Sequence, residues 1–282
     1  MTNLEVREFI STIRRQLFLS ALMRFSLLIL VTSGIVAMPF YASENRPSDI
    51  LWAVSLLAGL TWISLTFLSV KQLRAANQGV VYLADGRLDL AADQFSTAAL
   101  QFSLFRVGKL RACNNLAVVA HGRGKFEEAA QLLDAILQIL RRPDQTLTKT
   151  ARLLLADCRL SLGDATTANE VLAPILTNGQ RQSLTEQLLL LPIQIRCQVA
   201  IGDFKSAVDN LPWKLKRAEL LDSPRAAQVH ALLSEACRQT DRLAEANFLM
   251  TRAHLYADLS EIMDERPGLR DLLFSTTSAD NI

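Results

Sequence analysis

The chain has 282 residues, of which 50% are apolar and 6% aromatic, and its formal net charge is only +2. From residue 75 onward there are 23 Lys or Arg against 24 Asp or Glu, without the clustered positive charge that a nucleic-acid surface needs. The apolar excess is concentrated before residue 71. The composition therefore excludes a nucleic-acid-binding protein and indicates a membrane segment followed by a nearly neutral region.

Two uncharged segments precede residue 71. Residues 50–70 are long enough as a helix to cross a hydrocarbon core of about 30 Å. Residues 25–41 are also uncharged, and a short polar link, 42–49, joins the two. The sequence thus predicts a transmembrane hairpin. One alternative is a cleaved signal peptide, for which the residues before Ala42 offer a poor cleavage site; the other is a core hairpin of a soluble protein.

Arg24 stands at the start of the first predicted span. We expect it at the membrane interface, where its stem can reach the headgroups. Residues 4–23 then form an interfacial helix. Contact with the bilayer is expected through residues 17–70. The membrane anchor as a whole comprises residues 1–74. The polar side of the interfacial helix carries Arg7, Arg14 and Arg15.

The basic residues near the two spans lie on one side of the hairpin. They are Arg7, Arg14, Arg15, Arg24, Lys71 and Arg74, whereas the link carries only Arg46 beside two acids. Because positive charge stays on the cytoplasmic side, both termini are expected in the cytoplasm. The expected location is the inner (cytoplasmic) membrane of a bacterium.

A turn signal recurs after residue 75 at steps of 38, 39, 39 and 39 residues. Its lead residues are Gly86, Gly124, Gly163, Gly202 and Asp241, and an alanine follows each by five positions, at Ala91, Ala129, Ala168, Ala207 and Ala246. A small residue at a fixed distance from a helix-breaking turn is typical of stacked helical hairpins. The sequence predicts an all-α fold in which residues 75–263 form an α-solenoid of about five hairpins.

Three prolines interrupt the third and fourth repeats: Pro174, Pro192 and Pro212. Each removes a backbone donor and is expected to end or kink a helix. The fourth hairpin is therefore predicted to be irregular, with a short helix over residues 213–221.

The first repeat contains Gly79, Tyr82, Gly86, Ala91, Phe95 and Ala98. This pattern resembles the tetratricopeptide repeat (TPR) family, and the resemblance extends over residues 71–263, degenerating in the later repeats. The period of 38 to 39 exceeds the 34 of that family; HEAT-type repeats have the longer period but lack the glycine and alanine register. The resemblance implies a concave groove, lined by the first helix of each hairpin, that binds a protein or peptide.

Seven residues are predicted to face that groove: Arg111, Asn114, Asn115, Asp157, Arg196, Glu235 and Arg238. The spacing is 39 residues between successive members of the set Asp157, Arg196 and Glu235, which should therefore form a ladder of alternating charge. This ladder either contacts a partner or forms a row of salt bridges between repeats. Arg111 and Asn115 also fit two places of the carboxylate clamp that the family resemblance suggests. Ala76 and Val80 depart from that clamp.

Residues 264–282 complete the chain. Leu269, Leu272 and Leu273 stand at helical spacing, which predicts a helix that caps the exposed end of the solenoid. The alternative is a segment that lies in the groove. Residues 275–282 are expected to form a frayed tail.

No pattern of catalytic or metal-binding residues is present in the sequence. The three histidines are not at metal spacing, the four cysteines follow the repeat, and residues 122–125 lack the spacing of a phosphate-binding loop. We therefore expect no catalytic residue, no cofactor, no metal and no enzyme activity. A membrane-tethered adaptor for a cytoplasmic protein is the expected function; a structural subunit of a larger membrane complex is the alternative, and a regulator of an enzyme a third class.

Overall fold

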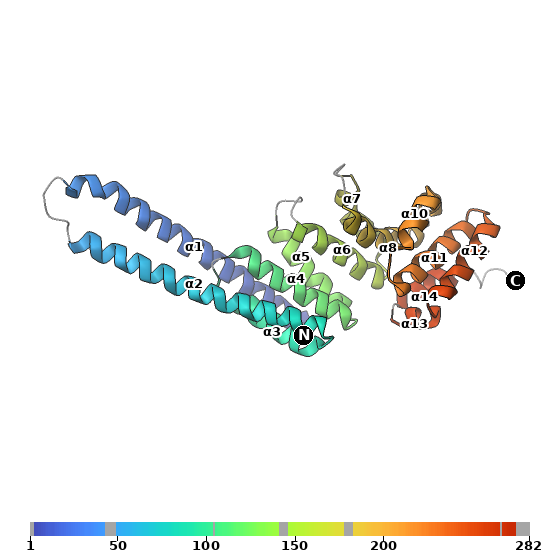
Figure 1. The fold of residues 1–282 in the computed structure, drawn as a ribbon, viewed down its shortest axis with the longest axis horizontal. Coiled ribbons are helices and arrows are strands. Elements are labelled where there is room, and N and C mark those ends of the chain that lie inside the picture. Colours follow the sequence, from blue (N-terminus) through green and yellow to red (C-terminus); the bar gives the residue numbers. More distant parts are fainter. Residues whose placement is uncertain are drawn as a thin grey trace. The chain divides into compact units, whose positions relative to one another are not determined.

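The computed structural model describes residues 3–42, 49–103, 105–140, 146–177, 183–265 and 267–274, and every regular element in these residues is an α-helix (Figure 1). The all-α fold class is therefore confirmed. The chain divides into two compact units, Met1–Arg123 and Gly124–Ile282. The predicted tail at 275–282 and most of the predicted link, residues 43–48, lie outside the described residues.

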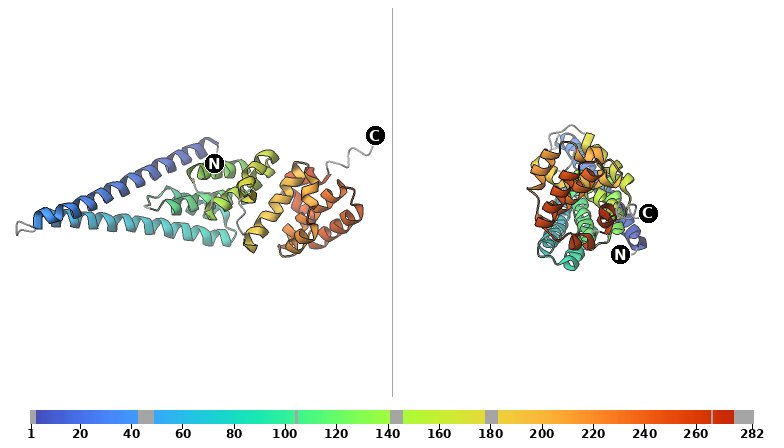
Figure 2. Two further views of the ribbon diagram at one scale, coloured as in Figure 1. Left: turned by 90° about the horizontal axis from the view of Figure 1, so that it is seen from above. Right: turned by 90° about the vertical axis from the view of Figure 1, so that its right-hand side faces the viewer.

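The N-terminal unit consists of two long helices and two shorter ones: α1 (Asn3–Ala42), α2 (Asp49–Ala84), α3 (Leu88–Leu100) and α4 (Arg106–Gly122). Helices α1 and α2 form an antiparallel hairpin (Figures 1 and 2). Helix α3 packs against α2, and α4 packs against α3.

Helix α1 runs through Arg24 without a break, so residues 4–23 and 25–41 belong to one helix. Its first half buries Val6, Phe9 and Ile13, which share one face of the helix. That face packs within the N-terminal unit, where α1 contacts α2 and α3. The apolar face of this part of α1 therefore contacts protein.

Helix α2 passes residues 70 and 74 without interruption. Its 36 residues correspond to a length of about 54 Å, enough to cross a hydrocarbon core and continue about 20 Å beyond it. No proline or turn residue separates the two parts. The end of the second predicted span is therefore the first helix of the first repeat, and no linker exists at the predicted boundary.

The five turn residues share one backbone conformation. Gly86, Gly124, Gly163 and Gly202 have φ between 72° and 81°, and Asp241 has φ 59°. At the first turn, Arg87 N donates to Tyr82 O (2.9 Å) and Gly86 N donates to Leu83 O (3.1 Å). This Schellman pattern ends a helix and recurs at Gly163, Gly202 and Asp241. The predicted helix corners are confirmed, and all five spaced alanines are buried.

Gly79 lies where α2 meets α3. A Cβ atom added there would come within 2.6 Å of the buried Phe95 ring. We expect Gly79→Ala to lower the free energy of unfolding by about 1–2 kcal/mol, since overpacking outweighs the gain in helix propensity. Thermal unfolding of the full chain in detergent measures this. Gly59→Ala, in the same helix with no atom within 4 Å, is the control and should be neutral or stabilising; equal losses in both variants would contradict the close α2–α3 packing.

The C-terminal unit contains ten further helices among its described residues. They are α5 (Phe126–Ile139), α6 (Thr146–Ser161), α7 (Ala165–Thr177), α8 (Leu184–Ala200), α9 (Phe204–Val208), α10 (Leu211–Ala218), α11 (Ser223–Arg238), α12 (Leu243–Tyr256), α13 (Leu259–Glu265) and α14 (Pro267–Phe274). The first helices of successive hairpins, α6, α8 and α11, pack against one another. Helices α7, α9 and α12 follow them as the second helices.

Local sequence signals explain where these helices begin. Ser183 and Glu186 form a reciprocal capping box at α8, in which Glu186 N donates to Ser183 Oγ and Ser183 N donates to Glu186 Oε2. The carboxylate of Asp222 accepts from Arg225 N at the start of α11.

The fourth hairpin is irregular, as the sequence predicted. Its second helix, α9, has five residues, and Asn210, with φ 50°, redirects the chain into α10, where Pro212 stands in the first turn. Of the two outcomes expected for Pro174 and Pro192, an end or a kink, neither proline ends its helix, because they lie inside α7 and α8.

The four cysteines, Cys113, Cys158, Cys197 and Cys237, are free and buried. Burial raises the pKa of the Cys113 and Cys158 thiols to about 12 and that of Cys197 to about 11. At pH 8 we therefore expect maleimide to label none of them in the folded chain and all four after unfolding, as mass spectrometry will show. Labelling of the native chain at the rate of a free thiol would contradict this packing.

Candidate functional site

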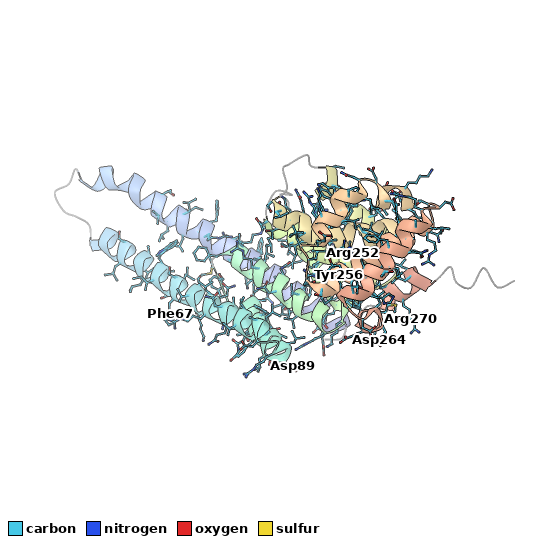
Figure 3. The ribbon with its side chains drawn as sticks, turned by 45° about the vertical axis from the view of Figure 1, so that its right-hand side comes forward. Phe67, Asp89, Arg252, Tyr256, Asp264 and Arg270 are labelled. Carbon is cyan, nitrogen blue, oxygen red and sulfur yellow. The ribbon has the colours of Figure 1, made fainter. Side chains whose placement is uncertain are left out.

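Helices α1 and α2 present a long apolar surface. The segments Glu5–Ser33 and Ser55–Ala84 have mean hydropathies of 1.6 and 1.4 in their most apolar windows. By length and composition, each is able to cross a membrane. A core helix of a soluble protein meets the same criteria, but it is mostly buried, whereas only 6% and 17% of these windows are buried. Phe67 on α2, labelled in Figure 3, is 69% exposed, and Ile63 on the same helix is 65% exposed.

Two members of the predicted charge ladder form a buried ion pair. Arg196 Nη1 on α8 donates to Asp157 Oδ1 on α6 at 3.0 Å, and the two side chains are only 1% and 12% exposed. Ser161 Oγ lies 3.4 Å from both terminal nitrogens of Arg196. The 39-residue spacing therefore brings these residues together between adjacent repeats. The pair is positioned to hold two hairpins in register. This favours salt bridges between repeats over contact with a partner as the role of the ladder.

The other predicted groove residues differ in their accessibility. Glu235 is buried, and its carboxylate pairs with Arg238 on the same helix at 2.9 Å. Arg238 is itself partly exposed. In the N-terminal unit, Asn114 is buried, Asn115 is half-buried and Arg111 is exposed. Arg111, Asn115 and Arg238 are thus the residues of this set that solvent reaches most readily.

The C-terminal helix α14 lies on the side of the first helices. It contacts α6 and α11, and it buries Leu269 and Leu273 in the core of this unit. The predicted helix is present, and its contacts place it beside the first helices of the third and fifth hairpins. Helix α12, which a capping segment would cover, keeps Phe248 and Leu255 exposed.

A cluster of buried polar side chains joins α1, α2 and α4. Lys109 on α4 is 2% exposed and donates from Nζ to Gln16 Oε1 on α1. Burial lowers the pKa of Lys109 to about 8. Gln72 on α2 is buried beside Gly108. These residues were not predicted from the sequence, although the absence of any Asp or Glu from residues 94–126 is a signal for them.

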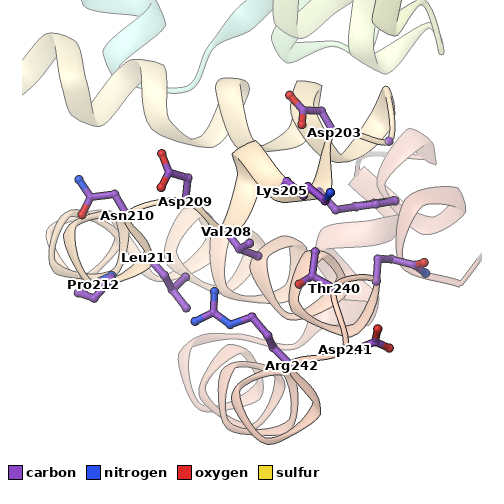
Figure 4. A pocket seen from close by; sticks show the side chains of 13 residues that line it. Asp203, Lys205, Val208, Asp209, Asn210, Leu211, Pro212, Thr240, Asp241 and Arg242 are labelled. Carbon is purple, nitrogen blue, oxygen red and sulfur yellow. The ribbon is translucent and has the colours of Figure 1, made fainter.

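An open depression of about 810 Å³ lies between the turn after α8 and the turn after α11 (Figure 4). Two of its charged side chains make hydrogen bonds or ion pairs with residues close to them in the sequence. Asp203 accepts from Ser206 N at the start of α9, and Arg242 pairs with Glu245. The mixture of charges does not define one class of ligand.

The described residues contain no group of three or more His, Cys, Asp or Glu side chains placed to hold a metal ion. His230 is buried and uses Nδ1 to bond Ala226 O at 2.8 Å, so it serves its own helix.

Comparison with known proteins adds little to this description. No protein-family model matches the sequence, and no curated protein is significantly similar to it. A solved structure of a MamA point mutant is similar over 66% of this chain and 98% of its own, with 17% sequence identity and a TM-score of 0.45. A likeness of that extent carries no argument about function, and the fold class rests on the helices themselves.

Proposed function

We propose that this protein is a membrane-tethered helical-repeat scaffold that holds a protein partner against the membrane. The continuity of α2 supports this proposal most strongly. An apolar, exposed segment long enough to cross a bilayer continues without a break into the first repeat. A helix of this kind holds the first repeat beside the membrane, whereas a flexible linker would let it move freely.

The proposed location is the inner membrane of a bacterium, with both termini in the cytoplasm. The basic residues beside the apolar segments support this orientation, because all but Arg46 flank the open end of the hairpin: Arg14, Arg15, Arg24, Lys71 and Arg74. The repeats then lie on the cytoplasmic side, where a soluble partner can reach them.

We further propose that the repeats belong to the TPR family and bind their partner on the side of α6, α8 and α11. Helix α14 already occupies part of that side through Leu269 and Leu273. A short helix with leucines four residues apart therefore fits this surface, and an amphipathic partner helix is the proposed ligand. Arg111, Asn115 and Arg238 supply accessible polar contacts within their own units.

A peptide of residues 259–274, labelled with a fluorophore, tests this binding mode. We expect the peptide to bind a chain that ends at Asp258, as followed by fluorescence anisotropy in detergent, and not to bind the full chain, in which α14 itself occupies that part of the surface. Leu269→Ala/Leu273→Ala in the peptide should abolish binding. Arg270→Ala, at an exposed position, is the matched control and should leave binding unchanged.

Circular dichroism of the shortened chain shows whether that chain is still folded. If that chain retains its helical content and thermal transition but does not bind the peptide, the proposed binding side is wrong. Equal binding to the full chain would also contradict the proposal, because the surface would then lie elsewhere.

A structural subunit of a larger membrane complex is the second candidate. It is favoured by the small residues on α2, Ser55, Ala58 and Gly59, since small residues let transmembrane helices approach one another. Gly59 has no side-chain neighbour within 4 Å, so another helix has room beside it. Light scattering after mild detergent extraction distinguishes the two: a monomer or dimer supports the scaffold, and a large stable particle supports the subunit.

A further inference from the structure

We propose that the exposed face of α12 binds a second copy of this chain, so that two C-terminal units associate through antiparallel α12 helices. This surface consists of other residues than the apolar N-terminal segments and the proposed binding side on α6, α8 and α11. The inference goes beyond the scaffold function proposed above and does not depend on it.

Helix α12, the second helix of the last hairpin, is covered on one face only. That face packs against α11 and buries Ala246, Leu249 and Ala253. Helices α13 and α14, which follow α12 in the chain, contact α11 as well. Phe248 and Leu255 are left 56% and 81% exposed at the end of the C-terminal unit (Figure 1). Large apolar side chains on one face of a helix are typical of an interaction surface when they gather there at this exposure.

The exposed face has the spacing of a contact between two helices. Four exposed residues follow one another at steps of four, three and four: Ala244, Phe248, Thr251 and Leu255. This mean period of about 3.5 residues keeps two helices in contact along their length. The occupant that fits the stripe is therefore another helix.

The stripe is complementary in size to an inverted copy of itself. In an antiparallel pair with a two-fold axis at the middle of the stripe, Ala244 of each copy lies opposite Leu255 of the other, and Phe248 lies opposite Thr251. Each large side chain then meets a smaller one, which allows the two helices to pack closely. A parallel pair would set Ala244 against Ala244 and Phe248 against Phe248. The pattern therefore favours a second copy in the antiparallel orientation.

The charges beside the stripe are complementary in the same arrangement. Glu245 and Arg252 lie on one flank, seven residues apart, and their side chains are 47% and 31% exposed. The two-fold axis brings the same flank of both helices together, so Glu245 of each copy faces Arg252 of the other. Within its own chain Glu245 pairs with Arg242, and Arg252 pairs with Glu219. The contact would extend these pairs into networks, which fix register more than they add affinity.

The length of α12 predicts the strength of the contact. Its 14 residues correspond to a length of about 21 Å. A contact along one such helix belongs to the class of small, transient interfaces, which bury less than about 1,200 Å² in total. We therefore expect a reversible dimer whose fraction rises with protein concentration.

Mixed disulfide cross-linking of the full chain in detergent tests this arrangement. Ala244→Cys and Leu255→Cys are made in two chains that carry different tags, and the native cysteines are buried. We expect mild oxidation of the mixture to join the two variants. Neither variant alone should form a cross-linked dimer, because identical positions lie about 16 Å apart along the antiparallel pair. A disulfide requires a Cα separation of no more than about 7 Å.

Charge reversal supplies an independent measurement. In a dimer of identical chains, Glu245→Arg brings two arginines together at each end of the contact, and Arg252→Glu brings two carboxylates together. Sedimentation of the full chain in detergent should show self-association weakened about tenfold for each variant alone. A mixture of the two variants should associate as the wild type does, because both pairs of opposite charge are restored. This recovery would exclude misfolding as the cause of the loss.

An apolar variant and its matched control locate the contact on α12. Leu255→Glu should weaken self-association by about tenfold or more, since it places a carboxylate in the middle of the pair. Leu184→Glu, at a leucine of α8 that is 54% exposed, should leave it unchanged. Equal losses in both variants would contradict a specific contact through α12.

Three further results would overturn the inference. Cross-linking of Ala244→Cys alone would show a parallel pair, and no cross-link in the mixture would show that the two helices do not meet. Undiminished association of both charge-reversed variants would place the dimer contact in another part of the chain. Cross-linking of Leu255→Cys to a different protein in intact membranes, in place of the second copy, would assign this face to that protein.

Discussion

Replacing Arg196 by alanine should lower the free energy of unfolding by about 3–5 kcal/mol. The change leaves the Asp157 carboxylate, which is 88% buried with its partner in place, without its counter-charge at the contact between α6 and α8. Thermal or chemical unfolding of the full chain in detergent, followed by circular dichroism, measures the loss. The double variant Asp157→Leu/Arg196→Met should recover most of it, because apolar residues can replace a buried ion pair with little cost.

The matched control for this result is Arg159→Ala. Arg159 Nη2 pairs with Asp134 Oδ2 at 2.7 Å, but the side chains are 23% and 40% exposed. An exposed pair of this kind contributes at most about 1 kcal/mol. If Arg196→Ala were as mild as Arg159→Ala, the inter-repeat role of Arg196 would be contradicted, and the partner-contacting interpretation of the charge ladder would regain support.

Two arginines placed in the middle of α2 should release the protein from membranes. Leu60 and Ile63 are 56% and 65% exposed near the centre of the predicted span. In water, surface substitutions of this kind change stability by about 0.5 kcal/mol or less. In a bilayer, each arginine costs about 2.5–3.5 kcal/mol. We therefore expect Leu60→Arg/Ile63→Arg to lose most of its membrane integration, measured as the pelleted fraction after alkaline extraction.

Leu243→Arg is the control for that experiment. Leu243 is 61% exposed, but it lies at the start of α12, far along the chain from the apolar segments. It should remain in the pellet together with the wild type. If the double variant also stays in the pellet while retaining its helical content, α2 does not cross the membrane.

The repeat architecture followed from local signals, and the positions of the helix ends show why. The turns at Gly86 and Gly163 have a positive φ, and a buried alanine follows each by five residues. The glycine and the alanine can both be read directly from the sequence. The extents of α1 and α2 were not predicted correctly from the sequence. The expected boundaries at Arg24 and residue 74 were drawn where charge appears, but a charged residue does not end a helix; a glycine turn, a proline or a cap does.

The candidate site was only partly predictable, because burial depends on neighbours that are distant in sequence. The 39-residue spacing correctly predicted that Asp157 and Arg196 would meet. Their residue types suggested an exposed surface, yet packing between α6 and α8 buries them. Likewise, the spacing of Leu269 and Leu273 predicted a helix, but not the side of the repeats that it would cover. The cluster around Lys109 depends on contacts among three helices and has no local motif.

Cysteine labelling in intact spheroplasts tests the central claim most directly. The native cysteines are buried, so Ser48→Cys in the link and Arg87→Cys in the first repeat turn can each be read against a low background. We expect a membrane-impermeant maleimide to label Ser48→Cys before lysis and Arg87→Cys only after lysis, with both variants in the membrane fraction. Labelling of Arg87→Cys before lysis, or recovery of either variant in the soluble fraction, would contradict a membrane hairpin that carries the repeats on the cytoplasmic side.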